Sequence, residues 1–214
     1  TARPNKKEQK NIKHHLYGVV DINKSFSTGQ WLKLAIKKIK EIRKRKKIPI
    51  LVGGTGLYFQ SIINGLAKIP NIPLEFRKKV RFIQKKEGQK KFYKKLLKLD
   101  KNIKDKFDSN DVQRSIRAFE IKLYTKISMY NWIKQTKSMF NENEFIKLYI
   151  DFERTELVKR IFLRTFKMIK EGAIKEVKKF IKLKIKKDHS VNRVIGIDEL
   201  TQYLNKTINL DQAQ

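Results

Sequence analysis

The first third of the chain carries an apolar pattern that predicts a helix followed by a short strand. The helix is indicated by four apolar residues at helical spacing, namely Trp31, Ala35, Ile39 and Ile42. Ser27–Gln30 has the capping-box spacing and should begin this helix. Ile50–Val52 is then a wholly apolar run between a proline and a glycine cluster, as expected of a buried strand. A helix that leads into such a strand is typical of a parallel α/β sheet.

The rest of the chain predicts a helical insertion and a return to that sheet. Pro70 and Pro73 mark the first boundary, and Leu74–Leu99 is a lysine-rich helical region interrupted at Gly88. Phe145–Arg154 alternates at first, as a returning strand would, and two further helices follow it. We therefore expect an α/β core of residues 1–70 and 141–214, with a mostly helical insertion at 71–140.

The net charge identifies polyanions as the first class of partner to consider. Lys and Arg number 52 against 21 Asp and Glu, which gives +31. Such a charge attracts nucleic acid through its phosphates. The alternative is that the lysines reflect a compositional bias, so arginines are the better guide.

The chain has no cysteine, which excludes disulfides and thiolate metal sites. It also has no apolar run of the roughly 20 residues that cross a membrane. The first residues, "TARPNKKEQK", have no apolar core, so we do not expect them to be a signal peptide. We expect a soluble, cytoplasmic protein.

Two segments carry candidate chemistry. Gly53-Gly54-Thr55-Gly56 follows the predicted strand, and exposed amides with a threonine hydroxyl there could hold an anion. The alternative is a tight turn without a ligand. In the helix expected from Asp111 onward, one face is apolar and the other presents Gln113, Arg114 and Arg117. An ordinary solvated helix face is the alternative there.

Six short motifs in a fixed order extend this picture. They are Thr1-Ala2-Arg3-Pro4, His14-His15-Leu16, Phe26-Ser27, "PILVGGTGLY" at Pro49–Tyr58, "NDVQRSIRAFE" at Asn110–Glu120 and "RVIGIDEL" at Arg193–Leu200. In this order and spacing the sequence resembles the bacterial tRNA dimethylallyltransferases, over essentially the whole chain.

The resemblance implies a tRNA-modifying enzyme with a P-loop-type parallel sheet core. Members of this family transfer the dimethylallyl group of dimethylallyl diphosphate to N6 of the adenosine 3′ of certain anticodons. The implied partners are tRNA and dimethylallyl diphosphate, the implied cofactor is Mg²⁺, and we expect a monomer.

The resemblance also assigns residues. Thr55 corresponds to the family's threonine at the reaction centre and, with Gly53 and Gly54, would contact the diphosphate or the target nucleotide. The implied tRNA contacts are Thr55, Arg77, Gln113, Arg114, Ser115, Ile116, Arg117, Arg193, Val194, Ile195, Gly196, Ile197 and Asp198.

The family's P-loop and the Asp-Ser segment that carries its proposed general base would precede Thr1. The sheet core is therefore expected to be incomplete at its N-terminus, the usual Mg²⁺ ligands to be missing, and this chain alone to lack turnover. Asp21 is either a base or, the favoured interpretation, a loop-capping residue. His14 and His15 could donate to phosphate or pack beneath the sheet edge.

Two other functions compete with the enzyme. One is a truncated relic that binds tRNA without catalysis, and the other is a basic RNA- or ribosome-binding protein unrelated to prenyl transfer.

Overall fold

A computed structural model describes residues 3–5, 7, 9–24, 26–185 and 190–214. Thr1 and Ala2 of the first motif therefore lie outside the described residues. Contacts divide the chain into two units, one formed by Thr1–Leu51 with Ile146–Gln214 and the other by Val52–Phe145. One unit is thus inserted into the sequence of the other.

The unit Val52–Phe145 is helical. Its elements are α2 (Gly56–Ile63), α3 (Leu74–Glu87), α4 (Gln89–Leu99), η1 (Lys101–Ile103), α5 (Val112–Thr125), α6 (Met129–Lys134) and η2 (Glu142–Glu144). The helical region predicted at Leu74–Leu99 is confirmed as α3 and α4, and so is its interruption at Gly88, because α3 ends and α4 begins there.

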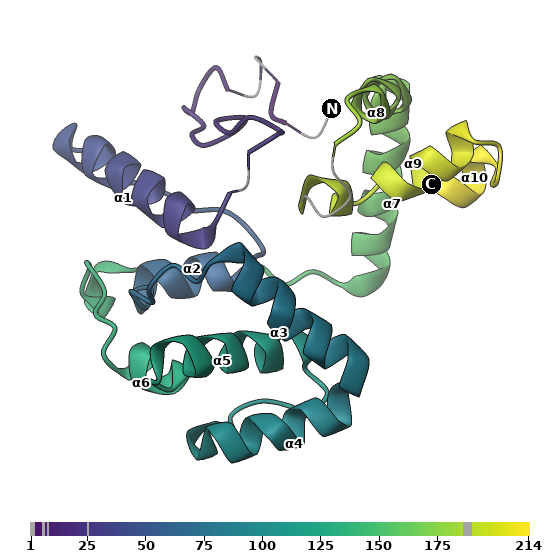
Figure 1. Ribbon diagram of the computed structural model, residues 1–214. Helices are drawn as coiled ribbons and strands as arrows, with labels where there is room; N and C mark the ends of the chain where they lie inside the picture. The colour runs from purple at the N-terminus through teal and green to yellow at the C-terminus, as the bar shows by residue number, and fades with distance from the viewer. Residues whose placement is uncertain (1–2, 6, 8, 25, 186–189) are drawn as a thin grey trace. The chain divides into compact units, whose positions relative to one another are not determined.

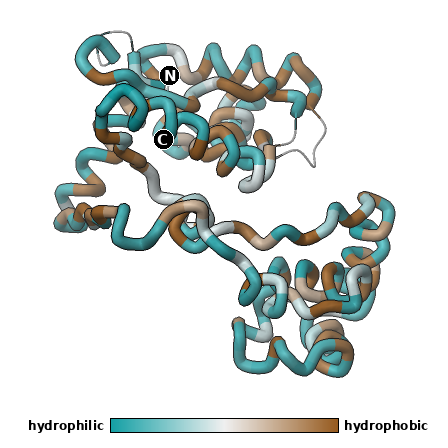
Figure 2. Tube along the Cα trace, turned by 90° about the vertical axis from the view of Figure 1, so that its left-hand side faces the viewer, coloured by the Kyte–Doolittle hydropathy of each residue, from teal (hydrophilic) through white to brown (hydrophobic). Residues whose placement is uncertain are grey.

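The core of this unit lies where α3, α4 and α5 pack together (Figure 1). Its buried apolar members are Val80, Phe92, Leu96, Ile103, Ala118 and Phe119. The rings of Phe92 and Phe119 join α4 to α5, with their centroids 4.9 Å apart. Apolar and polar residues are interleaved along the helices, as Figure 2 shows. At helical spacing the apolar residues gather on one face of a helix, and that face packs into the core.

Helix α2 is tied to the end of the same unit. The Ser138 hydroxyl donates to the Ile62 carbonyl at 2.8 Å. Gly65 has φ +83°, and a Cβ built on it would lie 2.5 Å from the Lys137 carbonyl oxygen. Only glycine fits such a close backbone approach at positive φ. These contacts place α2 with the helical unit, so the division lies at Leu51/Val52 and not at the Pro70 break.

The unit Thr1–Leu51 with Ile146–Gln214 is also built of helices. They are α1 (Thr28–Lys44), α7 (Arg154–Lys170), α8 (Ala173–Lys182), η3 (Ser190–Arg193), α9 (Ile197–Leu204) and α10 (Leu210–Ala213). The predicted capping box of α1 is confirmed, because Gln30 N donates to Ser27 Oγ at 3.2 Å and Ser27 N donates to Gln30 Oε1 at 2.8 Å. The core of this unit joins α8 to α9 through Ala173, Val177 and Leu200.

The predicted strand at Ile50–Val52 is wrong for the described structure. The segment is irregular, and the side chains of Ile50 and Val52 are 77% and 91% exposed. No strand forms anywhere in the described ranges. A strand exists through hydrogen bonds to a neighbouring strand, and an apolar run without such a neighbour stays extended in solvent.

The predicted strand at Phe145–Arg154 is wrong for the same reason. Ile146–Glu153 has no regular structure, and Ile146 and Tyr149 are 89% and 90% exposed. The helix that follows has the expected apolar stripe, but several of its side chains, including Ile161 and Phe162, are more than half exposed. The structure thus places a helical fold where the sequence predicted an α/β core.

The helices in the described part of the chain were searched for a membrane span. None combines the length and the apolar character that a crossing requires.

Candidate nucleic-acid interface and glycine turn

The Gly-Gly-Thr-Gly segment leads directly into α2. Thr55 is the N-cap residue of that helix, with extended backbone at φ −82° and ψ 100°. Its hydroxyl makes no capping hydrogen bond with the described residues, while its carbonyl accepts from Tyr58 N at 3.0 Å. The segment from Gly53 to Thr55 is exposed. The hydroxyl and the neighbouring amides are therefore accessible to an anion.

The fold does not explain why glycines stand in this segment. Gly53, Gly54 and Gly56 all have φ outside the left-handed region. A Cβ on Gly54 or Gly56 would meet none of the described atoms within 4 Å, and one on Gly53 would only touch the Phe59 ring at 3.9 Å. A tight turn would have required positive φ or crowding. The remaining physical reason is room for something to approach the backbone, which favours the ligand hypothesis over the tight turn.

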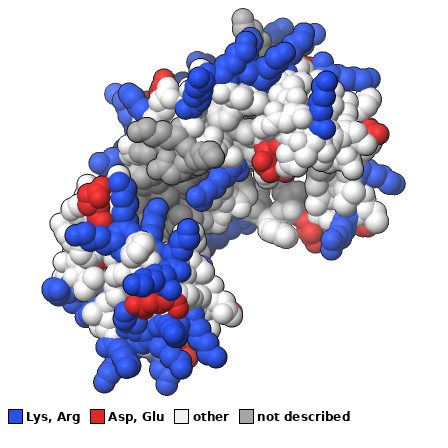
Figure 3. Space-filling view, turned by 45° about the vertical axis from the view of Figure 1, so that its right-hand side comes forward, with Lys and Arg blue, Asp and Glu red and all other residues white. Residues whose placement is uncertain are grey.

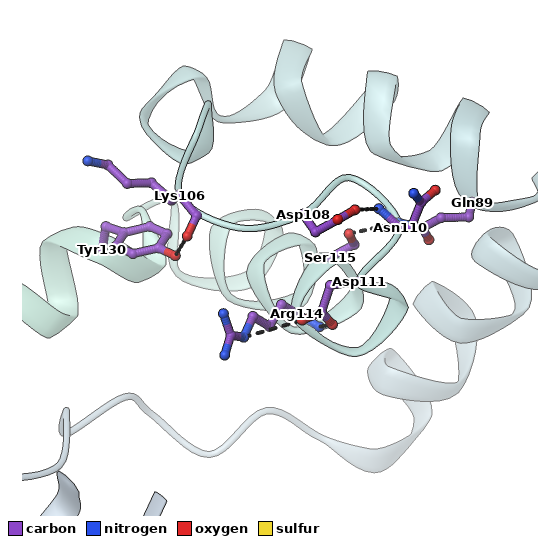
Figure 4. A network of polar contacts seen from close by, with 8 residues as sticks. All are labelled: Gln89, Lys106, Asp108, Asn110, Asp111, Arg114, Ser115 and Tyr130. Atoms are coloured by element: carbon purple, nitrogen blue, oxygen red, sulfur yellow. Dashed lines mark hydrogen bonds and ion pairs between the residues drawn. The ribbon is translucent and has the colours of Figure 1, made fainter. Parts of the chain in front are cut away.

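The N-terminus of α5 is fixed by a network of short polar contacts (Figure 4). Arg114 N donates to Asp111 Oδ1 at 2.9 Å, so Asp111 is the N-cap, and Arg114 Nε pairs with Asp111 Oδ2 at 3.3 Å. Gln89, at the start of α4, donates from Nε2 to Ser115 Oγ at 3.0 Å and to the Ser109 carbonyl at 2.5 Å. These bonds fix the helix that presents the Gln-Arg-x-x-Arg segment.

The structure divides that segment into exposed and buried members. Gln113 and Arg114 are exposed, and Arg117 is partly exposed. Ser115 is fully buried and accepts from Gln89, while Ile116 packs against the core cluster. Ser115 does not reach the surface of the described fold, and the partly buried Ile116 is turned toward the core, because both lie on the inner side of α5. An RNA contact is therefore a sound expectation only for the other three.

Arg77 belongs to a charged group that includes two residues the sequence analysis missed. Arg77 and Arg81 lie one turn apart on α3, which packs against α5. Glu120 of α5 is 3% exposed, and its Oε2 is 3.5 Å from Arg117 Nη1. The signal was present in the sequence: a carboxylate on the apolar face of a helix, three residues after an arginine, seldom lies there unpaired.

Burial governs the acidity of Glu120. Loss of solvent raises the pKa of this carboxyl above its ordinary value, and the positive charges of Arg117, Arg77 and Arg81 oppose that rise. Three guanidinium groups on two helices therefore act electrostatically on one buried carboxylate, and of these Arg117 forms the ion pair.

The Arg193–Asp198 segment lies in the other unit. Arg193 is exposed, and Ile195 at the tip is 97% exposed. Gly196 adopts φ +91° as the N-cap of α9, and its N–H donates to Glu199 Oε2 at 3.0 Å. Ile197 packs against the α8–α9 core, so it holds the loop while Arg193 and Val194 face solvent.

The remaining candidates have local roles. Asp21 accepts from Asn23 N at 2.8 Å, which confirms the loop-capping interpretation. His14 pairs through Nδ1 with the Ile12 carbonyl at 2.8 Å, and its ring lies edge-on to Tyr17. His15 is partly buried. No sheet forms in the described ranges, so packing of either histidine beneath a sheet edge is not observed.

The described residues form no cluster of side chains that would hold Mg²⁺ by themselves. Nowhere among them do three or more His, Cys, Asp or Glu side chains come together. Magnesium prefers an octahedral set of oxygen ligands, and carboxylates are its usual protein donors. No residue is therefore assigned to a metal.

Positive charge dominates the visible surface. Figure 3 shows Lys and Arg side chains over both units, with few Asp and Glu between them. The surface of each unit suits a polyanion.

Comparisons with known proteins agree with this chemistry. The family model described as IPP transferase matches residues 1–214. The tRNA dimethylallyltransferase of Pelagibacter ubique (strain HTCC1062) is 73% identical over 214 residues, covering 100% of this chain and 68% of that protein.

Solved structures are similar as well. The tRNA isopentenylpyrophosphate transferase of Bacillus halodurans aligns with a TM-score of 0.61 at 30% identity, over 99% of this chain and 65% of that one. A eukaryotic dimethylallyltransferase acting on tRNA aligns with a TM-score of 0.78 at 24% identity, over 99% of this chain and 54% of that one; at this identity the likeness concerns the fold alone. The chain spans about two thirds of the length of its bacterial relatives.

Proposed function

Because the chain belongs to the IPP transferase family, we propose that it is part of a tRNA dimethylallyltransferase. The observation that carries this function is the 73% identity, over all 214 residues, to a protein of that name. At such identity the whole described chain has a counterpart in the relative, including both candidate segments. The substrates would be tRNA and dimethylallyl diphosphate.

The proposed reaction is a substitution at carbon. The exocyclic N6 of an adenosine attacks C1 of the dimethylallyl group, a C–N bond forms, and the C1–O bond to the diphosphate breaks. Pyrophosphate leaves with the electron pair of that bond, and N6 loses one proton. Charge builds on the departing oxygens, so hydrogen-bond donors near them stabilise the transition state.

Thr55, Gly53 and Gly54 would supply such donors. The Thr55 hydroxyl is accessible and takes no part in capping α2, and the glycine backbone has free space beside it. In this role Thr55 contacts the diphosphate or the target nucleotide. An adenosine in a stacked loop must first leave the stack before its amino group can attack.

The tRNA would be held through its backbone. Gln113, Arg114 and Arg117 of α5, with Arg77 of α3, form the polar group in the helical unit, and the exposed loop at Arg193–Ile195 provides a second contact. Protein contacts to RNA go largely to phosphate and sugar, which suits arginine and amide side chains.

The Mg²⁺ expected for the family is assigned to no residue, and neither is a general base. When bound, Mg²⁺ would neutralise charge on the diphosphate. Asp21 caps a turn through Oδ1, which favours the loop-capping interpretation over a role as general base.

A parallel sheet is a further part of this proposal. The apolar segments at Ile50–Val52 and Ile146–Ile150 would become strands when neighbouring strands pair with them. In the longer Pelagibacter relative, we expect slow hydrogen exchange at the corresponding amides. Fast exchange at these amides would contradict the proposed strands. We also propose a cytoplasmic monomer, which sedimentation and cell fractionation would test.

The decisive experiment uses the complete gene product that carries these residues. It is incubated with dimethylallyl diphosphate and unmodified tRNA, and the nucleosides are then analysed by mass spectrometry. The expected product is an adenosine that has gained a dimethylallyl group, with release of pyrophosphate. Tight tRNA binding without this product would support the non-catalytic relic. Equal affinity for tRNA and unrelated RNA, again without product, would support the general RNA-binding alternative.

A further inference from the structure

The helical unit contains a charged cluster, and the function proposed above gives a role to only some of its residues. Its members are Arg77 and Arg81 on α3, and Arg117 and Glu120 on α5. The two helices pack against each other, and the rings of Phe76 and Tyr124 meet between them at 5.3 Å. Since all four residues lie in one unit, their mutual placement is part of its fold.

Spacing along the helices sets the arrangement. Arg77 and Arg81 are four residues apart, so their side chains leave α3 on the same side. Arg117 and Glu120 are three residues apart on α5 and form an ion pair at 3.5 Å. In this pair the Glu120 side chain is only 4% exposed, whereas that of Arg117 is 40% exposed. The carboxylate is thus the buried anchor, and the guanidinium group reaches the surface.

Two buried atoms of this cluster have unused hydrogen-bonding capacity. Glu120 Oε1 is an acceptor and Arg77 Nε is a donor, and neither has a partner among the described residues. Arg77 makes only a long contact from Nη2 to Asn71 Oδ1, at 3.5 Å. A buried carboxylate oxygen without a hydrogen-bond partner costs free energy, so a hydrogen bond to a nearby donor is favourable. In this cluster the groups of opposite charge on the facing helix are Arg77 and Arg81.

We propose that Glu120 is a positioning residue which holds Arg77, Arg81 and Arg117 as one phosphate-binding group, and that Arg81 contacts the RNA backbone together with the other two. This inference rests on the tRNA function proposed above. It adds Arg81, which lies outside the six motifs, and it gives a role to Glu120, the last residue of the Asn110–Glu120 motif. Each guanidinium offers a rigid fork of donors that matches a phosphate, and a fixed side chain loses less entropy on binding than a mobile one.

The proposal predicts an unusual effect on tRNA binding when one negative charge is removed. Glu120→Gln removes a negative charge beside an RNA-binding surface, and simple electrostatics predicts tighter binding of tRNA. A positioning role predicts the opposite, because the guanidinium groups lose the carboxylate that orders them. The direction of the change therefore separates the two.

The first experiment compares Glu120→Gln with Glu75→Gln. Glu75 also lies in this unit, on α3, but it is exposed and pairs with Lys78 at 2.9 Å. Both variants raise the net charge by the same amount. We expect Glu120→Gln to weaken tRNA binding about two- to fivefold, the equivalent of one partly exposed ion pair. Glu75→Gln should bind as well as the wild type or slightly better.

The second experiment tests Arg81 and remains informative if Glu120→Gln folds poorly. Arg81→Ala is compared with Lys79→Ala, an exposed cation on the same helix. Arg81→Ala should weaken tRNA binding more than Lys79→Ala and reduce the slope of log affinity against log salt by about one. In addition, Glu120→Gln should have a smaller further effect when combined with Arg117→Ala than on its own, because the carboxylate acts partly through that side chain.

A pH series gives a readout that a merely structural role would not produce. The charged groups facing Glu120 are Arg117 on its own helix and Arg77 and Arg81 on α3. As pH falls through the pKa of Glu120, the wild type should lose its advantage in tRNA binding over Glu120→Gln. Circular dichroism at each pH would confirm that both proteins are folded.

The outcomes distinguish this inference from the function beneath it. If the wild type binds no tRNA, the proposed function fails and the phosphate-binding group fails with it. If the wild type binds tRNA but Glu120→Gln matches Glu75→Gln and Arg81→Ala matches Lys79→Ala, the positioning inference alone is overturned. Weaker binding by Glu120→Gln and by Arg81→Ala, relative to their controls, would support it.

Discussion

At the scale of single residues, a substitution at Thr55 should change the rate of catalysis but hardly change the stability of the fold. Its side chain is exposed and caps nothing in the described structure, so Thr55→Ala should change the free energy of unfolding by no more than about 0.5 kcal/mol. In the complete gene product the same change should slow dimethylallyl transfer about tenfold or more, as for a lost transition-state contact. Urea unfolding and single-turnover transfer assays measure the two effects. An early-melting variant with an unchanged transfer rate would restore the tight-turn interpretation.

Glu120 makes the stability of the fold depend on pH in a defined direction. Its pKa in the folded protein is raised, chiefly by burial, above the ordinary 4.5. The folded state therefore binds this proton more tightly than the unfolded state does. The stabilisation it brings is fully present below the unfolded pKa and is lost as pH rises through the folded pKa.

Urea unfolding of the wild type and Glu120→Gln over a pH series would measure this dependence. The stability of the wild type relative to the variant should be greatest at low pH and should decline as pH rises. A difference that instead grew with pH would mean that the three arginines outweigh the cost of burial.

At the scale of elements, two glycines with different surroundings make a matched pair. Gly65 has positive φ and lies against the Lys137 backbone, so Gly65→Ala should destabilise the unit by more than about 1 kcal/mol and loosen α2. Gly54 has neither restraint, and Gly54→Ala should change the free energy of unfolding by less than about 0.5 kcal/mol. Denaturant unfolding compares them. Equal losses would mean that α2 is not held through the turn at Gly65.

The helices also show how much of the structure the spacing of apolar residues predicts. Helix α5 begins at the predicted place because Asp111 caps it, and its apolar face packs against α3 and α4 as its spacing required. The two predicted strands did not form, because a strand needs a neighbouring strand to pair with and a local sequence pattern does not provide one.

At the scale of the whole molecule, charge should control association with tRNA. With a net charge of +31, the affinity should fall steeply with salt, by about a thousandfold between about 50 mM and about 200 mM if about six phosphates are contacted. Filter binding at several salt concentrations measures the slope. Arg117→Ala should make it shallower by about one. Affinity that did not respond to salt would contradict binding through phosphates.

The sequence by itself determined the positions of most helices, the glycine turn, the cap at Ser27 and the family of the protein. These follow from local spacing, capping chemistry and short motifs, all of which are written along the chain. The loop-capping role of Asp21 was open to the same local reasoning.

Only the tertiary structure decided which residues of a motif reach the surface. Ser115 lies in the same Gln-Arg-x-x-Arg segment as Arg114, yet one is buried against Gln89 and the other is exposed. It also packed α3, which carries Arg77 and Arg81, against α5, which carries Glu120. The same structure left Ile50–Val52 without a strand partner. The physical reason is that burial, ion pairing between helices and strand pairing all depend on groups that are distant along the chain.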